Sequence, residues 1–187
     1  MNGHRRFAAV AIIVALAFPG LAAAQPAMPS AAQIEGQLKA PRPPIPPNSR
    51  VTIPELTRRP DLRAAVPSID IQSINFAFGS AAIDYSELPK VENIAIALRR
   101  LLQRNPNELF LLEGHTDAVG SRFSNQVLSE QRADTLRRVL TSTFGIPSGV
   151  VVAVGYGEDF LLVPVDYAEW RNRRVTIRRI TDVVVPF

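Results

Sequence analysis

The 187-residue sequence contains no cysteine. This absence excludes a thiolate nucleophile, a thiolate-ligated metal ion, a disulfide and a lipid-modified N-terminal cysteine. The fold must therefore be stabilised by packing alone, which is compatible with an exported protein.

Histidine is almost as scarce, with only His4 and His115. A metal site or an acid–base pair is one interpretation of His115, which lies two residues before Asp117. However, a zinc site would lack further ligands, and a nucleophile would lack its base partner. We therefore expect no enzyme activity, no metal and no cofactor, and we interpret His115 as a strand-end residue whose ring bonds a backbone group.

Long apolar runs are also missing. A basic start precedes an apolar run from Phe7 to Phe18, a break at Pro19 and Gly20, and small residues suited to cleavage. The run is shorter than the roughly 20 residues that a membrane-spanning helix needs. Residues 1–24 are therefore predicted to be a cleaved signal peptide rather than a retained anchor, and the expected location is the periplasm, with or without an association with the outer membrane.

Neither the charge nor the aromatic content favours nucleic acid as a partner. The net charge is only +4, and arginine doublets such as Arg99-Arg100 and Arg137-Arg138 are interleaved with acidic residues. Such interleaving is typical of solvated faces. Only 7% of residues are aromatic, and no row of them follows the predicted strands as a stacking surface for bases.

Proline divides the chain into segments. Most of the 16 prolines lie in residues 25–67, which predicts an extended, Pro-rich tether with little core of its own. A short helix at Ala31–Lys39 is compatible with this segment. The compact domain is expected at residues 68–182, and residues 183–187 are interpreted as a tail.

The periodicity of residues 68–182 predicts an α/β fold. Apolar residues alternate along 68–78, as in a half-buried strand with an irregularity near residues 73–75. Steps of three and four residues predict one helix ending near Arg104 and a second at 124–143, while strands are expected at 109–113, 150–154 and 173–180. The order β-α-β-α-β-β predicts a two-layer α/β sandwich, a mixed sheet with helices on one face.

The second predicted helix has polar residues in its core-facing stripe. At roughly 100° per residue, one stripe collects the following residues: Asn125, Leu128, Ser129, Arg132, Ala133, Leu136, Val139 and Leu140. Its polar half lies nearest the 114–123 loop. An arginine in such a stripe costs several kcal/mol unless it is paired, so Arg132 needs an anion.

Asp117 is the candidate partner of Arg132. It follows the second strand, at the sheet edge where α/β folds gather ligands. One interpretation is a structural ion pair that closes the loop onto the helix. The other is a ligand site, favoured by the small residues of the loop and by the positive end of the helix macrodipole. A ligand that carries both an ammonium and a carboxylate group would satisfy Asp117 and Arg132 together.

Ordered motifs over residues 69–180 add a family resemblance. EGHTDAVGS (113–121), LSEQRA (128–133), VAVGYGE (152–158) and NRRVTI (172–177) together resemble the OmpA-like C-terminal domain family. The resemblance implies the sandwich fold and the binding of peptidoglycan without cleavage. It also implies that Asp117 holds the ammonium of the diaminopimelate side chain, that Arg132 holds its carboxylate, and that Arg173 is a supporting cation. The resemblance further assigns four residues to the pocket lining: Thr116, Ala118, Gly120 and Asn125.

Several positions depart from the family pattern. Ala77 and Gly79 stand where an acidic or amide residue is common, Leu161 replaces a usual proline, and Glu169 stands in place of an arginine. These departures concern the affinity and the 158–170 loop rather than the fold.

We therefore predict a non-enzymatic, periplasmic module of a Gram-negative envelope that binds peptidoglycan and tethers or organises the envelope. The Pro-rich segment could also contact other envelope proteins. The alternative is an envelope protein–protein interaction module in which Asp117 and Arg132 form a structural ion pair and the Pro-rich segment docks in an aromatic groove of a partner.

Overall fold

The computed structural model describes residues 27–41, 46, 49–72, 74–76 and 79–185. The predicted signal peptide and Ala77 lie outside these residues. Among the helices within them, none combines the length and the apolar character that crossing a membrane requires.

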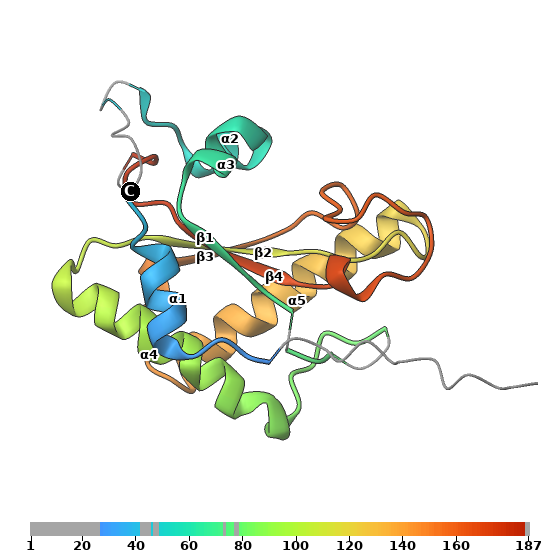
Figure 1. Cartoon of the computed structure of the whole chain (residues 1–187), viewed down its shortest axis with the longest axis horizontal. Coiled ribbons are helices and arrows are strands. Elements are labelled where there is room, and N and C mark those ends of the chain that lie inside the picture. The colour runs from blue at the N-terminus through green and yellow to red at the C-terminus, as the bar shows by residue number, and fades with distance from the viewer. Residues whose placement is uncertain (1–26, 42–45, 47–48, 73, 77–78, 186–187) are drawn as a thin grey trace, which may run out of the picture.

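A four-stranded mixed sheet forms the centre of the fold, in the order β1-β4-β2-β3 (Figure 1). Its strands are β1 (Ser68–Ile71), β2 (Phe110–Gly114), β3 (Val151–Gly155) and β4 (Val175–Arg179). β2 pairs in parallel with β3 and antiparallel with β4, and β1 pairs antiparallel with β4. The central position explains why all five residues of β2 are buried.

Two long helices cover one face of this sheet (Figure 1). α4 (Leu88–Arg104) and α5 (Arg122–Ser142) bury apolar residues at helical spacing, and Leu98, Leu136 and Leu140 are fully buried in the main core. Single-turn 3₁₀ helices are η2 (Tyr85–Glu87), η3 (Ser148–Val150) and η4 (Trp170–Asn172). The predicted two-layer α/β sandwich is confirmed, and both long helices end close to the predicted residues.

The first strand is shorter than predicted. It was expected over residues 68–78, but β1 ends at Ile71, which pairs with Val175, the first residue of β4. β4 offers no partner beyond that pair. Farther along, Phe76 forms only an isolated bridge with Ile83.

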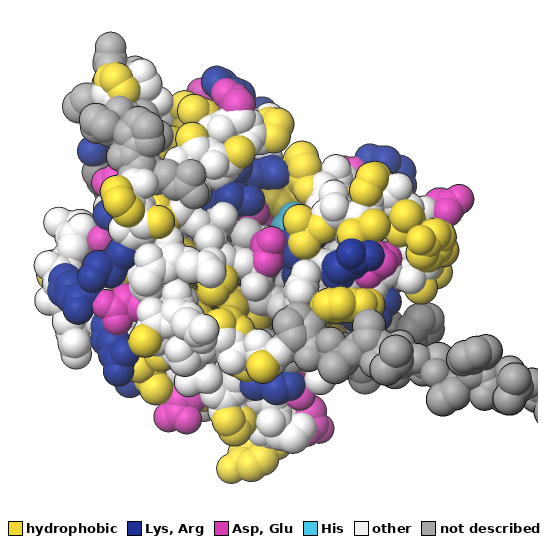
Figure 2. Space-filling model, in the orientation of Figure 1, with side chains coloured by type: hydrophobic (Ala, Val, Ile, Leu, Met, Phe, Trp, Pro, Cys, Tyr) yellow, Lys and Arg dark blue, Asp and Glu magenta, His cyan; other side chains and the backbone are white. Residues whose placement is uncertain are grey.

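The prediction of an extended tether is wrong for the described part of residues 25–67. α1 (Ala31–Leu38) begins with a capping box between Ser30 and Gln33, and its Ile34 and Leu38 are fully buried in the main core. Its Glu35 pairs with Arg100 and Arg104 of α4. Figure 2 shows basic and acidic side chains interspersed over α1 and α4.

Two further short helices lie on the opposite face of the sheet (Figure 1). They are α2 (Ile53–Arg58) and α3 (Pro60–Ala65), and both carry proline in the first turn, where it does not interrupt helical hydrogen bonding. A second apolar cluster covers this face, formed by Leu56, Val66, Leu111, Ile180, Val183 and Val184. Residues 183–187 were predicted to be a tail, but Val183 and Val184 are buried in this cluster.

Candidate ligand-binding site at the end of the central strand

Two glycines bring the polar half of α5 directly onto the ends of β2 and β3. A Cβ atom on Gly114 would lie 2.2 Å from the carbonyl oxygen of Ser129, and one on Gly155 would lie 2.3 Å from the amide nitrogen of Glu130. No side chain fits in either place. The contact is fixed by a hydrogen bond of 2.8 Å from the amide of Gly157 to Oγ of Ser129.

The predicted stripe of α5 is the buried side of the helix. Asn125, Ser129 and Arg132 are buried in its first half, and Leu136 and Leu140 are buried in its second half. The polar half lies beside the loop that follows β2, as the helical winding predicts.

A cavity of about 490 Å³ lies between this half of α5, the loop after β2 and the turn before β4. Six of the seven predicted site residues line it: Thr116, Asp117, Gly120, Asn125, Arg132 and Arg173. Ala118 is not among the lining residues. Phe76, Leu128 and Ala168 add apolar walls, and Gly79 lines the region where the family pattern carries a polar residue.

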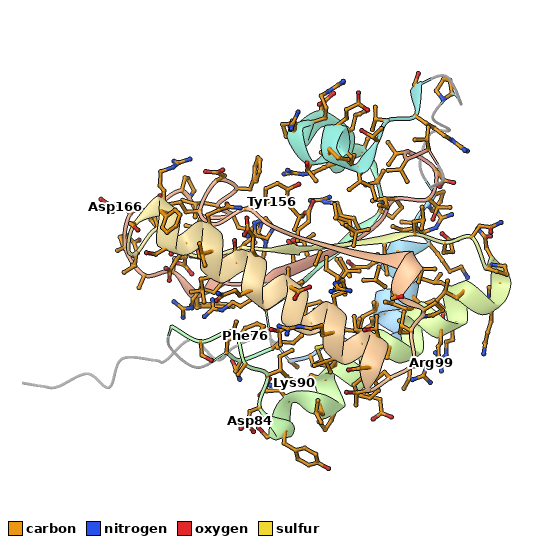
Figure 3. The ribbon with its side chains drawn as sticks, turned by 180° about the vertical axis from the view of Figure 1, so that it is seen from behind. Phe76, Asp84, Lys90, Arg99, Tyr156 and Asp166 are labelled. Carbon is orange, nitrogen blue, oxygen red and sulfur yellow. The ribbon has the colours of Figure 1, made fainter. Side chains whose placement is uncertain are left out.

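Arg132 is a buried cation that no carboxylate of the described residues neutralises within 4 Å. It is 8% exposed, and its Nε donates a hydrogen bond of 3.1 Å to the carbonyl of Ser80. Its guanidinium carbon lies 5.0 Å from the ring centroid of Phe76, a side chain labelled beside α5 in Figure 3. Burial lowers the pKa of Arg132, and the charge of Arg173 lowers it further, while Asp117 compensates in part. An anion at this place would be strongly favoured.

Asp117 pairs with a different arginine. It is 7% exposed, and Nη1 of Arg173 donates a hydrogen bond of 2.7 Å to its Oδ2. The structural ion pair between Asp117 and Arg132, which the sequence left open as an alternative, is therefore not the pair that forms. Arg173 takes this place because the turn before β4 lies next to the end of β2 in the sheet.

Asn125 connects the loop after β2 with the loop after β3. Its Nδ2 donates hydrogen bonds to Oε2 of Glu158 at 2.6 Å and to the carbonyl of Asp117 at 3.3 Å. Sequence reasoning missed the role of Glu158, although this residue ends the VAVGYGE motif. The amide of Thr116 donates to the carbonyl of Gly157, whereas Oγ1 of Thr116 is buried without a partner among the described residues.

The interpretation of His115 as a ring that bonds a backbone group is wrong. Both ring nitrogens are buried without a hydrogen-bond partner in the described part of the chain. The ring stacks on Tyr156 at 5.7 Å, and its Nε2 lies 3.9 Å from Oε2 of Glu113, too far for a hydrogen bond. Burial lowers the pKa of His115, so the imidazole is neutral near pH 7.

A buried ion network lies next to His115 on the face covered by α2 and α3. Arg63 of α3 places its guanidinium carbon 4.1 Å from the ring centroid of Tyr156 and 3.9 Å from that of Phe160. Its Nε lies 3.3 Å from Oε1 of Glu113, and Arg178 donates to Oε2 of the same carboxylate at 2.8 Å. Figure 3 shows Tyr156 on the side of the sheet where these helices pack. Sequence reasoning missed this network because Arg63 lies in the Pro-rich segment.

Comparisons with known proteins agree with the fold and cover the region of the site. A family model described as the OmpA family matches residues 75–174. Outer membrane porin F of Pseudomonas aeruginosa is 36% identical over 104 residues, which cover 54% of this chain and 29% of the porin. The peptidoglycan-associated lipoprotein of Legionella pneumophila is 31% identical over 105 residues, which cover 54% of this chain and 55% of that protein. These matches therefore span less than two thirds of either relative.

Among solved structures, the cell wall anchor of the T6SS from Pseudomonas aeruginosa has a similar fold. It superposes with a TM-score of 0.51 at 24% sequence identity, and the match covers 70% of this chain and 97% of that chain.

Proposed function

This chain belongs to the OmpA family, and we propose that its folded domain binds peptidoglycan without cleaving it. The bound group is the zwitterionic end of a diaminopimelate side chain, held between Asp117 and Arg132. The name of the lipoprotein relative from Legionella pneumophila, which describes it as peptidoglycan-associated, supports this choice of ligand.

The observation that carries the proposal is the buried charge of Arg132 in the 490 Å³ cavity, which Asp117 compensates only in part. A guanidinium in this position binds a carboxylate through charge-assisted hydrogen bonds, which are among the strongest that proteins make. Across the cavity, Asp117 offers the opposite charge to an ammonium group. A ligand with only an ammonium group would leave Arg132 unmatched, whereas Asp117 already has an ionic partner in Arg173.

Arg173 acts as a positioning residue in this proposal. Its hydrogen bond to Oδ2 fixes the carboxylate of Asp117, while Oδ1 accepts only a long hydrogen bond of 3.3 Å from the amide of Val119. Oδ1 therefore keeps the capacity to accept a stronger bond from the ligand ammonium. Asn125 orients the same loop through its bonds to Glu158 and to the carbonyl of Asp117.

The biological setting is part of the proposal. Residues 1–24 would direct export, residues 68–182 would form the peptidoglycan-binding domain, and the protein would work in the periplasm of a Gram-negative cell by tethering or organising the envelope. The outer-membrane names of several relatives support an envelope location. No catalytic step and no cofactor are required for this role.

A pull-down with purified peptidoglycan tests the proposal. We expect wild-type protein to be retained by diaminopimelate-type peptidoglycan and much less by lysine-type peptidoglycan, because lysine lacks the carboxylate that Arg132 would bind. Asp117→Asn and Arg132→Gln should each weaken retention by about tenfold to a hundredfold, the usual effect of losing a hydrogen bond to a charged group.

Matched controls remove a charge of the same sign from exposed positions. Asp159→Asn lies in the loop after β3, and Arg138→Gln lies on the outer side of α5. Both controls should bind like wild type. Full retention of folded Asp117→Asn and Arg132→Gln proteins would exclude the site.

A further inference from the structure

A second, smaller cavity adjoins the proposed diaminopimelate pocket. The two cavities share Phe76, Arg132 and Arg173 in their walls. The smaller one has a volume of about 110 Å³ and extends toward the end of β1 and the start of β4, where Asn75 and His115 line it. A molecule held in the larger pocket could therefore extend into the smaller one past Arg132.

The described residues that line this cavity are cationic in sum and include no carboxylate. Three arginines contribute to it, but they differ in the hydrogen bonds already made. Arg174 uses all three of its side-chain nitrogens within the protein, on Asp70, Asn172 and Phe160. Arg132 makes one hydrogen bond through Nε, and Arg173 makes one through Nη1. The guanidinium groups of Arg132 and Arg173 thus retain donors for an anion.

His115 is the second observation that points to a ligand here. Its side chain is 2% exposed, and both ring nitrogens lack a hydrogen-bond partner among the described residues. A buried polar group without a partner is destabilising, so such groups in folded proteins call for an explanation. A neutral imidazole presents one N–H donor. Oε2 of Glu113 lies 3.9 Å from Nε2, beyond hydrogen-bond distance, so an anion in the cavity that His115 lines would supply the missing acceptor.

We propose that this cavity is a second anion subsite, which binds a free carboxylate of the same stem peptide outside the zwitterionic diaminopimelate end. This inference rests on the proposed function. The volume of about 110 Å³ accommodates a carboxylate group. Carboxylates are also the anions that a peptide stem carries next to its diaminopimelate residue.

The subsite makes the protein sensitive to amidation of its ligand. Converting the bound carboxylate to an amide removes the charge and places an NH₂ donor against the donors of Arg132 and His115. Such a mismatch lowers affinity both by losing attraction and by leaving polar groups unpaired. We expect a preference of about tenfold or more for the free acid.

Calorimetric titration of the full chain with three synthetic tripeptides tests the subsite. All contain alanine, γ-linked glutamate and meso-diaminopimelate. One has every carboxylate free, one is amidated at the α-carboxylate of glutamate, and one is amidated at the backbone carboxylate of diaminopimelate. For wild type, one of the two amidations should weaken binding by about tenfold or more.

Two variants then assign the effect to this cavity. His115→Phe removes the unpaired donor and should reduce the acid-to-amide ratio to less than about threefold, while binding still depends on Asp117. Asn75→Leu removes an exposed amide from the same wall and should lower the acid-to-amide ratio to a smaller extent. If His115→Phe does not fold, the result with Asn75→Leu is the one that tests the subsite. Arg138→Ala is the charge control, since it removes a cation from the outer side of α5 and should leave the ratio unchanged.

The outcomes separate this inference from the proposed function. Equal affinity of wild type for all three tripeptides would overturn the subsite and leave the diaminopimelate site intact. Failure of every tripeptide to bind would overturn the proposed function as well. An undiminished preference in His115→Phe, or in Asn75→Leu if only that variant folds, would place the selective contact outside this cavity.

Discussion

Replacing Arg63 by alanine should destabilise the fold by about 3 kcal/mol, although the residue lies in a Pro-rich segment that resembles a linker. Arg63 is 3% exposed and Glu113, its ionic partner on the central strand, is fully buried. The substitution removes this contact, the stacking on Tyr156 and Phe160, and a hydrogen bond of 3.1 Å to the carbonyl of Thr57.

The retained partner of Glu113 limits this cost. Breaking a buried ion pair costs about 3–5 kcal/mol when the remaining charge has no other partner. Here Arg178 still donates to Glu113 at 2.8 Å, so the ionic part should cost less than that range. The two contacts between the guanidinium and the aromatic rings contribute about 0.5–1 kcal/mol each at the low end of their range. With about 1–2 kcal/mol for the ionic contact and the hydrogen bond, the loss is about 3 kcal/mol, which corresponds to a decrease in Tm of about 6–12 °C for a chain of this size.

Urea unfolding followed by circular dichroism measures this effect. Arg63→Lys should recover only part of the loss, because lysine keeps the charge but not the flat stacking surface. Arg59→Ala, at an exposed position that pairs with exposed Asp61, should leave the free energy of unfolding close to that of wild type. If Arg63→Ala were as stable as Arg59→Ala, α3 would not be an integral part of the fold and the explanation would be wrong.

Three further predictions concern packing and pH. Gly114→Ala should cost about 1–3 kcal/mol or more because its Cβ would meet the backbone of Ser129, whereas Gly36→Ala, with nothing within 4 Å, should be neutral or slightly stabilising in urea unfolding. Ile34→Ala should cost about 2–5 kcal/mol in the same assay, and a loss below about 1 kcal/mol would show that α1 is not part of the core. Because burial lowers the pKa of His115 from its ordinary 6.5, stability should be full above that pH and should fall as the pH falls below it. His115→Phe should show a smaller decrease between pH 8 and 5.5, and identical pH profiles would contradict the lowered pKa.

The sheet and the long helices follow from periodicity in the sequence, because their burial is regular. The stripe of α5 places Leu136 and Leu140 in the core and Arg132 beside the loop after β2, and each of these residues is buried as the winding predicts. The apolar run of β2 likewise predicts its central position in the sheet.

The N-terminal helices could not be predicted in the same way. Proline content favours an extended chain, but Pro54 and Pro60 lie in the first turns of α2 and α3, where proline is tolerated. These helices have six residues each, too few for a helical period to show, and they are stabilised by contacts with distant strands. Arg63 therefore looks like an exposed linker residue until the sheet beneath it is known.

The members of the site were easier to predict than their partners. Loop position and helical winding predict that Asp117 and Arg132 face the same region, and both line the same cavity. The choice of Arg173 as the ionic partner of Asp117 depends on the pairing of β4 with β2, which is a long-range contact. The unpaired ring of His115 has no signal in the sequence, since a satisfied and an unsatisfied histidine look alike there.

The most direct test of the central claim is a crystal structure of the protein with a bound diaminopimelate tripeptide. We expect the ammonium of the side chain within about 3 Å of the carboxylate of Asp117 and its carboxylate within about 3 Å of the guanidinium of Arg132, with Arg173 still bound to Asp117. A ligand bound elsewhere on the chain, with Arg132 unengaged, would contradict the account.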